Sequence, residues 1–351
     1  MRRVFYLILS VALLSACSKK GAEYLSADGF AQGSTYHIVY SIPETAKEKE
    51  KFRTEVEELI EDSFYQINKS VSGYDSTSIL SRANRGENPQ LNRIFTDVFN
   101  YAKQIYKESN GAVDASAAPL FDIWGFGFKN KVPVTQEKID SIKQFVGMEK
   151  VNISSSGLLI KSDSRISLNF NAIAQGYTTD YFARQFDSLG IENYLIEIGG
   201  EIYCKGLSSK GRNWRVGIDA PRDGNFIPGE DIQAVIELSG RGLVTSGNYR
   251  KFYVAEDGQK YSHTIDPASG RPVQHTLLSA TVIADNATVA DAYATYFMVV
   301  GLEKAKEILA TREDMEALLI YGEQENMKSY ETPGLKKMIV GSSKLKTENN
   351  T

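Results

Sequence analysis

The sequence predicts an α+β fold in which mixed sheets pack against helices. Helix-like and strand-like segments both occur along most of the chain, and they do not alternate strictly as they do in doubly wound parallel folds. The length of 351 residues suffices for one large domain or for two intimately packed halves. With 42% hydrophobic and 24% charged residues, the composition is typical of a soluble globular protein.

Five segments are predicted to be helices. In the first, Phe52, Val56 and Ile60 recur at helical spacing among many charged residues, which is typical of an amphipathic helix. The second ends at Ser109-Asn110-Gly111, a sequence that favours a helix stop, and the last is apolar along almost its whole length. The predicted helices are residues 45–69, 94–108, 135–145, 176–189 and 288–301.

Shorter runs rich in β-branched and aromatic residues predict strands. They are residues 36–42, 157–161, 194–198, 214–218, 234–238, 260–265 and 278–284. Just after the run at 260–265, Asp266-Pro267 followed by Ser269-Gly270 is typical of a hairpin or a tight loop.

The N-terminus predicts a secreted lipoprotein. Two arginines precede an apolar run from Val4 to Leu14, which is too short for a stable transmembrane helix. The Leu-Ser-Ala-Cys sequence that ends at Cys17 resembles a bacterial lipobox, whose cysteine is lipidated. We therefore expect a signal peptide at residues 1–16, a lipid such as palmitate on Cys17, and a polar tether over residues 17–30. An ordinary signal peptide with an incidental cysteine is the alternative.

The remaining composition narrows the class of protein. A net charge of −4 and a pI near 5.6 argue against a nucleic-acid-binding protein, which would show a basic surface. Cys204 is the only other cysteine, so no intramolecular disulfide is expected once Cys17 is lipidated, and Cys204 is predicted to be a small core residue. The body is predicted to span residues 31–341, followed by a polar tail over residues 342–351.

Asp291 is the unusual residue of the apolar helix 288–301. Burying an unpaired carboxylate is costly, and Thr295 follows four residues later on the same helix face. Together they form an oxygen-only patch that suits a hard cation such as Mg²⁺. The alternative is that Asp291 caps or pairs at the helix start while Thr295 bonds back to the chain, and the residues alone do not decide between the two.

Five stretches are dense in Gly, Asp, Asn, Ser and Thr, and each alone could serve only as turn chemistry. They are GAVDASAAPLFDIWGFG (111–127), LNFNAIAQGY (168–177), YLIEIGGEIYCKG (194–206), LVTSGNYRKF (243–252) and YSHTIDPASGRPV (261–273). The last contains His263, the only one of three histidines inside such a stretch. Its pKa would suit a general base, and a strand histidine bonded to a neighbouring loop is the alternative.

Together with GSTY (33–36), SGYDSTSILSRAN (72–84) and VADAYATYF (289–297), these stretches resemble the ApbE family of FAD:protein FMN transferases. The resemblance runs from about Gln32 to Gly341, with the motifs in the family's order. It implies an ApbE-like fold and a reaction in which FAD is cleaved at its pyrophosphate. The FMN moiety is joined through its phosphate to a Thr or Ser hydroxyl of a target protein, AMP leaves, and Mg²⁺ assists.

The resemblance also implies site residues. The metal ligands would be Asp291, Thr295 and the carbonyl oxygen of Ala172, with His263 beside the metal and the flavin phosphates. The residues implied to contact the cofactor are Gln32, Tyr74, Ala112, Val113, Asp114, Asn169, Gln175 and Ile265. Two of them depart from the family pattern: Gln32 stands where Met is frequent, and Asn169 stands where the family has Asp, so that a charge is lost.

The implied partners are FAD, flavin-carrying subunits of Rnf-type or Nqr-type redox complexes, and the membrane that holds the lipid. We expect the catalytic domain on the periplasmic side, anchored at the inner membrane, with the outer membrane as the alternative. Two alternatives remain on sequence grounds. One is a Mg²⁺-dependent FAD pyrophosphatase, in which water replaces the acceptor hydroxyl, and the other is a flavin-binding lipoprotein without catalysis.

Overall fold

The computed structural model describes residues 22–128, 133–222, 225, 229–248, 252–254, 260–322, 326–341 and 346–347; for 252–254, 260–261 and 346–347 it describes the backbone alone. The predicted signal peptide, Cys17 and most of the predicted tail lie outside these residues. Within them, no helix combines the length and the apolar character needed to cross a membrane.

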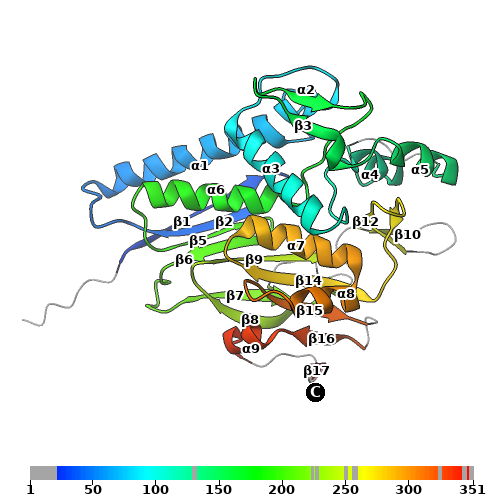
Figure 1. Ribbon diagram of the computed structural model, residues 1–351. Helices are drawn as coiled ribbons and strands as arrows, with labels where there is room; N and C mark the ends of the chain where they lie inside the picture. Colours follow the sequence, from blue (N-terminus) through cyan, green and yellow to red (C-terminus); the bar gives the residue numbers. More distant parts are fainter. Residues whose placement is uncertain are drawn as a thin grey trace, which may run out of the picture.

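A nine-stranded sheet runs through the centre of the molecule (Figure 1). Neighbouring strands are antiparallel throughout, except for the parallel pair at one edge, β16 and β17. In spatial order the strands are β1 (Tyr24–Ala31), β2 (Ser34–Ser41), β5 (Tyr194–Ile198), β6 (Glu201–Lys205), β9 (Arg241–Gly247), β14 (Leu277–Ala284), β15 (Glu316–Tyr321), β16 (Lys328–Glu331) and β17 (Lys346–Thr347).

Among the described residues, four two-stranded antiparallel sheets complete the strands, and the helices are mostly short. The small sheets pair β3 (Val151–Ile153) with β4 (Leu159–Lys161), β7 (Trp214–Asp219) with β8 (Ile232–Leu238), β10 (Phe252–Val254) with β11 (Lys260–Ser262), and β12 (Ile265–Asp266) with β13 (Arg271–Pro272). The helices are α1 (Lys49–Val71), α2 (Ile79–Asn84), α3 (Arg93–Glu108), α4 (Ala118–Trp124), α5 (Gln136–Lys143), α6 (Ala174–Ser188), α7 (Ala287–Val300), α8 (Leu302–Leu309) and α9 (Pro333–Met338).

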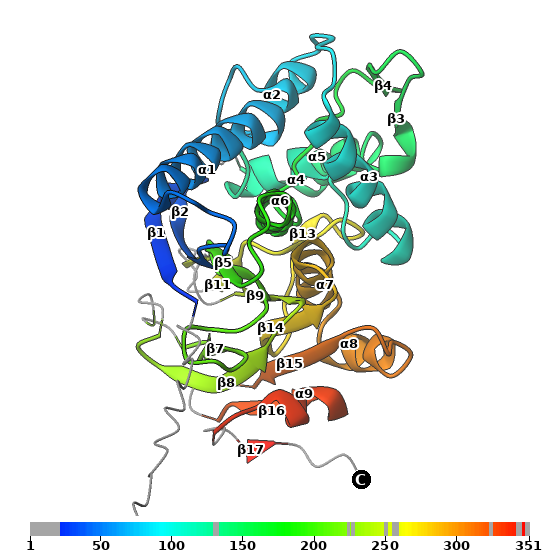
Figure 2. The same cartoon turned by 90° about the vertical axis from the view of Figure 1, so that its left-hand side faces the viewer.

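The central sheet is covered on both faces (Figures 1 and 2). Helices α1 and α6 bury aromatic and aliphatic side chains against β2 and β5. Helix α7 packs on β9 and β14 as part of the largest hydrophobic core, which also contains α3. The opposite face of β9, β14 and β15 packs against the β7–β8 pair and α9. The predicted α+β class, with mixed sheets and packed helices, is confirmed.

The five predicted helices are present as α1, α3, α5, α6 and α7, with ends shifted by a few residues. The predicted strand at 260–265 is wrong as a single element, because the chain breaks into β11 and β12 and leaves His263 in the break. The predicted hairpin that follows is confirmed as β12–β13. Cys204 is fully buried, as expected of a core residue.

Residues 24–30 form most of β1, so they belong to the body rather than to the predicted tether. No residue of β1, YLSADGFA, is fully buried, and every second residue from Ser26 to Phe30 is exposed on one side of this edge strand. Such a strand has no strong apolar pattern, and its pairing with β2 comes from a two-residue hairpin at Gln32 and Gly33.

Helices α6 and α7 approach each other at Gly176. A Cβ atom built on Gly176 would lie 2.4 Å from the Ala287 carbonyl oxygen and 2.8 Å from the Cβ of Asp291. Only a residue without a side chain therefore fits between the backbones, and this contact sets the position of Asp291.

We expect Gly176→Ala to lower the free energy of unfolding by about 1–3 kcal/mol, because the new methyl group meets rigid backbone. Gly217→Ala is the matched control, since its Cβ would meet only the end of the Ile232 side chain at 3.3 Å. Denaturant unfolding of both variants measures the difference. Equal stability of the two variants would contradict the close α6–α7 contact.

Candidate active site

Asp291 lies in the second turn of α7 with only 4% of its surface exposed. One carboxylate oxygen, Oδ2, accepts a hydrogen bond from the backbone N–H of Gly176 at 3.1 Å. The cap of α7 is a different residue, Asn286, whose side chain accepts from the N–H of Val289. Asp291 therefore does not cap its own helix, but it accepts an N–H group in the first turn of α6, as the structural alternative for this motif allows.

The start of α7 is held by a carboxylate from α6. Asp180 accepts hydrogen bonds from the backbone N–H groups of Ala287 and Thr288, both at 2.8 Å, and from the Thr288 hydroxyl. A negative charge at a helix N-terminus is favourable because it meets the positive end of the helix dipole. Burial nevertheless raises the pKa of Asp180, and its three hydrogen bonds act in the opposite direction.

Negative charge is concentrated around Asp291. Burial raises the pKa of Asp291 well above its ordinary value, and the charge of Glu201 on β6 raises it further. The Gly176 N–H lowers this pKa, and Asp180 adds a smaller repulsion. A carboxylate in this setting binds either a proton or another cation more readily than a solvated one does.

Three oxygens at this position have no hydrogen-bond donor in the described part of the chain. They are Oδ1 of Asp291, the hydroxyl of Thr295 one turn further along α7, and the carbonyl of Ala172 just before α6. The N–H of Gly176, which would bond to the Ala172 carbonyl in a regular helix, goes to Asp291 instead. In the part of the chain that the structure describes, the hydroxyl of Thr295 does not bond back to α7.

These three oxygens are of the kind that a hard cation takes as ligands. Among the described residues, no group of three or more His, Cys, Asp or Glu side chains could hold a metal ion by itself. A single carboxylate with a hydroxyl and a carbonyl suits Mg²⁺, which usually keeps several waters and takes further oxygens from a phosphate ligand.

Gln32 is directed to this region by the β1–β2 hairpin. Both residues of its two-residue loop have positive φ, 54° at Gln32 and 77° at Gly33, as a tight hairpin of this kind requires. The Nε2 of Gln32 donates to the Thr178 hydroxyl on α6 at 2.8 Å. Its Oε1 is buried, and no donor reaches it in the described part of the chain. A ligand N–H or hydroxyl would satisfy that oxygen.

Gln175 lies next to Gly176, and its amide nitrogen lies over Gly199 in the β5–β6 turn. A Cβ atom on Gly199 would be 2.2 Å from that nitrogen and 3.0 Å from the Glu201 carboxylate. The turn therefore brings the YLIEIGGEIYCKG stretch against the start of α6.

The loop before α6 is fastened to the GAVDAS stretch. Asn169 donates its backbone N–H to the Ala115 carbonyl at 2.7 Å, and its side-chain oxygen accepts from the N–H of Asn171. Asp114 accepts from both the N–H and the hydroxyl of Ser116. Burial raises the pKa of Asp114 to about 6 in spite of these two bonds.

The other residues implied to contact a cofactor differ in exposure. Tyr74 is 75% exposed, and its ring meets Phe128 edge-on, so an aromatic face remains open for stacking. Ala112 is partly exposed, whereas Val113 and Ile265 are buried in the core. Any ligand contact of Val113 or Ile265 therefore involves mainly the backbone.

His263 occupies the break between β11 and β12, and it is half-buried. Its ring lies 6.5 Å from the ring of Phe126, measured between centroids, in an edge-on arrangement. The adjacent Thr264 donates to the side chain of Asn248 at 2.7 Å, which joins the LVTSGN and YSHTIDP stretches. Strand β12 contacts α7, so the histidine segment runs beside the helix that carries Asp291 and Thr295.

Neither Asp180 nor Glu201 was predicted to belong to the site. Glu201 lies in the YLIEIGGEIYCKG stretch and Asp180 lies three residues after the LNFNAIAQGY stretch, but nothing in the sequence marks either residue as acting on Asp291. Their influence is visible only once α6, α7 and β6 are packed together.

The fold and this site define the chain as an enzyme of the flavin transferase class, as comparisons with known proteins show. A model of the ApbE family matches residues 32–319. The FAD:protein FMN transferase of Escherichia coli (strain K12) is 34% identical over 299 residues, which cover 83% of each chain. The FAD:protein FMN transferase of Vibrio cholerae is 31% identical over 344 residues, or 97% of this chain and 99% of the relative.

Two solved structures are similar to this chain over most of its length. The flavin transferase ApbE from Vibrio cholerae is 31% identical with a TM-score of 0.78, over 90% of this chain and 99% of the other. The Pseudomonas stutzeri flavinyl transferase ApbE, in its apo form, is 30% identical with a TM-score of 0.79, over 92% and 99%. The chain therefore belongs to the ApbE family. It is a transferase, with FAD as its flavin substrate.

Replacing the carboxylate that holds α7 tests the packing of the site. We expect Asp180→Ala to lower the free energy of unfolding by about 2 kcal/mol, because two buried N–H groups lose their acceptor. Asp285→Ala, which removes an exposed carboxylate just before α7, should change stability by less than about 0.5 kcal/mol. Chemical denaturation measures both, and similar values for the two variants would contradict the assignment.

Asp114 gives a pH-dependent prediction. The folded protein binds this proton more tightly than the unfolded chain, so the stability contributed by protonated Asp114 is lost as pH rises from about 4 to above 6. Asp114→Asn keeps the acceptor oxygen and removes the charge. At pH 8 we expect the variant to be more stable than the wild type, by up to about 3 kcal/mol. Unfolding curves should show the gap closing near pH 4, and a gap independent of pH would contradict the role of Asp114.

Proposed function

We propose that the protein catalyses Mg²⁺-dependent transfer of the FMN moiety of FAD to a Thr or Ser hydroxyl of a target protein, with release of AMP. The observation that carries the proposal is the set of three donor-free oxygens on Asp291, Thr295 and Ala172, beside a histidine segment, in a chain of the ApbE family. The proposal also assigns the cofactor contacts to Gln32, Tyr74, Ala112, Val113, Asp114, Asn169, Gln175 and Ile265.

The residues present fit a magnesium ion. The raised pKa of Asp291 reflects a buried negative charge that a cation would compensate, and all three open donors are oxygens. Asp291, Thr295 and the Ala172 carbonyl would hold the ion. Bound there, Mg²⁺ would neutralise charge on the FAD pyrophosphate.

The chain's own residues bind and position the reactants. In the transfer step the acceptor oxygen forms a bond to the phosphorus of the FMN phosphate. The bond from that phosphorus to the bridging oxygen breaks, and its electron pair leaves with AMP. His263 takes the proton of the acceptor hydroxyl as general base and passes it to solvent. The break between β11 and β12 places this residue on a loop beside α7.

Cofactor binding rests on polar groups that the fold leaves available. Gln32 offers a buried amide oxygen, and Tyr74 offers an open aromatic face for a ring system. Asn169 keeps the shape and the acceptor oxygen of the family's Asp, and it uses that oxygen to hold the turn that leads to Ala172. Because Asn169 is neutral, the electrostatic potential at this turn is less negative than it would be with a carboxylate, and the turn itself is retained.

The proposal includes the location and the partners. The signal-like N-terminus supports a body anchored by a lipid on Cys17 at the inner membrane, on the periplasmic side. The acceptors would be flavin-carrying subunits of Rnf-type or Nqr-type redox complexes.

Globomycin, which blocks cleavage of the lipoprotein signal peptide, tests the lipid anchor. We expect the uncleaved precursor to accumulate when cells are treated with it. A processed protein that carries no lipid would contradict the anchor.

One experiment tests the reaction. The protein is incubated with FAD, Mg²⁺ and an Nqr-type acceptor subunit, and the acceptor is weighed by mass spectrometry while AMP is measured. Transfer gives an acceptor heavier by one FMN moiety, together with stoichiometric AMP. Free FMN and AMP without labelled acceptor would instead indicate a pyrophosphatase, and unchanged FAD would indicate a flavin-binding protein without catalysis.

Asp291→Asn should separate the metal role from a structural one. We expect turnover to fall at least about 100-fold, because the variant loses the charge that attracts Mg²⁺. Without metal at neutral pH the variant should be at least as stable as the wild type, because burial disfavours the charge. Thermal unfolding with and without Mg²⁺ gives a second readout, since Mg²⁺ should raise the wild-type Tm alone. A fully active variant would exclude Asp291 as a ligand, and Asp285→Asn is the matched control.

A further inference from the structure

The turn between β6 and β7, residues 206–213, presents an apolar side chain to solvent. Leu207 in this turn is 45% exposed, and the hydroxyl of Tyr24, at the start of β1, donates to the Leu207 carbonyl at 2.7 Å. The rings of Tyr24 and Trp214 also meet edge-on, with their centroids 6.1 Å apart. The turn therefore lies beside the point where the chain enters β1.

Hydrogen bonds hold this turn in a fixed shape. The N–H of Leu207 donates to the side-chain oxygen of Asn193 at 2.8 Å. The N–H and the hydroxyl of Ser208 both donate to the Arg212 carbonyl, at 2.8 and 2.9 Å, and the indole N–H of Trp214 donates to a carbonyl at the end of β6. Because the turn is already ordered, burying Leu207 against a partner costs little further conformational entropy.

The turn carries two cations and no acidic residue. Its sequence is GLSSKGRN, and both Lys210 and Arg212 are exposed. Neither side chain forms an ion pair within the described part of the chain. Glu192, on the adjoining turn before β5, is also exposed and offsets one of the two positive charges. A leucine flanked by Lys and Arg suits a phospholipid surface, because the apolar side chain inserts while the cations stay at the headgroup phosphates.

The length of chain before β1 limits how far this turn can be from a lipid on Cys17. Tyr24 follows Cys17 by seven residues, and a fully extended chain of that length spans at most about 25 Å. A body of this size has a radius of gyration of about 20 Å, so the anchor would keep the end that contains Tyr24 close to the bilayer. Lys19 and Lys20 add positive charge next to the lipid.

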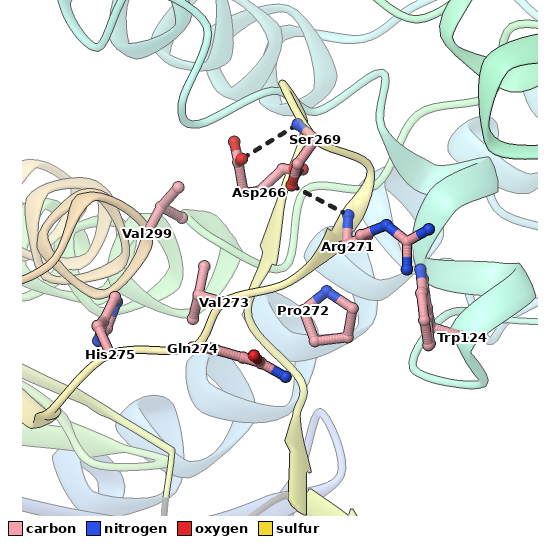
Figure 3. A pocket seen from close by; sticks show the side chains of 9 residues that line it. All are labelled: Trp124, Asp266, Ser269, Arg271, Pro272, Val273, Gln274, His275 and Val299. Atoms are coloured by element: carbon pink, nitrogen blue, oxygen red, sulfur yellow. Dashed lines mark hydrogen bonds between the residues drawn. The ribbon is translucent and has the colours of Figure 1, made fainter. Parts of the chain in front are cut away.

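The candidate active site lies at the other end of β1. This strand leads over eight residues from Tyr24 to the hairpin at Gln32, a distance of about 25 Å. Figure 1 shows β1 and β7 on one side of the molecule and β12 on the other. A cavity of about 520 Å³ lies on the β12 side, between α4, the β12–β13 hairpin and the end of α7, with Gln274 in its lining (Figure 3). A lipid contact at residues 206–213 would therefore leave the site and this cavity open to solution.

We propose that the turn at residues 206–213 docks on the phospholipid surface, with Leu207 inserted below the headgroups and Lys210 and Arg212 at their phosphates. The inference rests on the proposed lipid anchor at Cys17. The anchor attaches one point of the chain, and the turn supplies a second contact that gives the body one orientation. A leucine buried in lipid favours this orientation by at least about tenfold. An acceptor then reaches the active site from the solution side, on a part that projects from the membrane.

Fluorescence quenching tests the docked orientation. The full-length lipidated protein is placed in vesicles of phosphatidylethanolamine and phosphatidylglycerol, in which some lipids carry a nitroxide in the upper part of an acyl chain. Ser209→Cys places a fluorescent label in the turn, Gln274→Cys places one at the cavity, and Cys204 is buried and does not compete for the label. We expect the nitroxides to lower the fluorescence at position 209 at least about twofold and to leave that at position 274 unchanged, because a docked segment reaches the upper acyl region.

Variants of the turn make the test specific. Leu207→Asp should remove the quenching at position 209, whereas Ile160→Asp, which changes another exposed apolar side chain on β4, should leave it unchanged. Lys210→Glu combined with Arg212→Glu should reduce the quenching, and the charge-preserving pair Lys210→Arg with Arg212→Lys should retain it. All of these proteins should still float with the vesicles, because the lipid on Cys17 is unchanged.

Several outcomes would overturn the inference. One is an unquenched label at position 209 in a protein that floats with the vesicles, and another is equal quenching at positions 209 and 274. Full quenching in Leu207→Asp would show that the tether alone brings the turn near the membrane. A wild-type protein that does not float would instead contradict the lipid anchor, and the docking with it. The transfer reaction is tested separately by acceptor labelling, so its failure is distinguishable from each of these results.

Discussion

The contact between α6 and α7 is the interaction on which the candidate site depends. Gly176 lets the two backbones approach, and Asp180 binds the first N–H groups of α7. Together they determine where Asp291 lies, and the Gly176 N–H then orients its carboxylate. Because this N–H is used by Asp291, the Ala172 carbonyl keeps no donor and is available to a ligand. One close helix contact thus fixes the carboxylate and frees the carbonyl.

The contact between α6 and α7 also brings acidic side chains near one another. Asp291, Asp180 and Glu201 come from three different elements, and each of the latter two raises the pKa of Asp291. Such an arrangement disfavours the ionised form of Asp291 in the protein alone and becomes favourable when a cation binds. Hydrophobic packing of α7 against β9 and β14 supports this arrangement. Ionisation of Asp291 therefore lowers the stability of the folded protein but favours the binding of a cation.

Much of the fold was predictable because the relevant signals are local. The periodic segments of α1 and α3 and the β-branched runs of β5, β7 and β14 carry their own pattern. Strand β1 was missed because it is an exposed edge strand whose alternation is weak. In the site, the spacing of Asp291 and Thr295 was visible in the sequence. The contributions of Asp180 and Glu201 were not, since they depend on contacts between residues over 80 positions apart.

Asn169 stands where the family resemblance implies an Asp, and this difference is consistent with the electrostatic balance around Asp291. Asn169 retains the hydrogen bond to the Asn171 N–H, so the turn that presents the Ala172 carbonyl does not require a charge. Asp114, which is fastened to the same loop through Ala115, already carries a pKa raised to about 6 by burial. A further carboxylate at position 169 would add repulsion both to this loop and to an incoming pyrophosphate. The absence of a charge at Asn169 therefore reduces electrostatic repulsion in this loop, and the backbone turn that presents the Ala172 carbonyl is preserved.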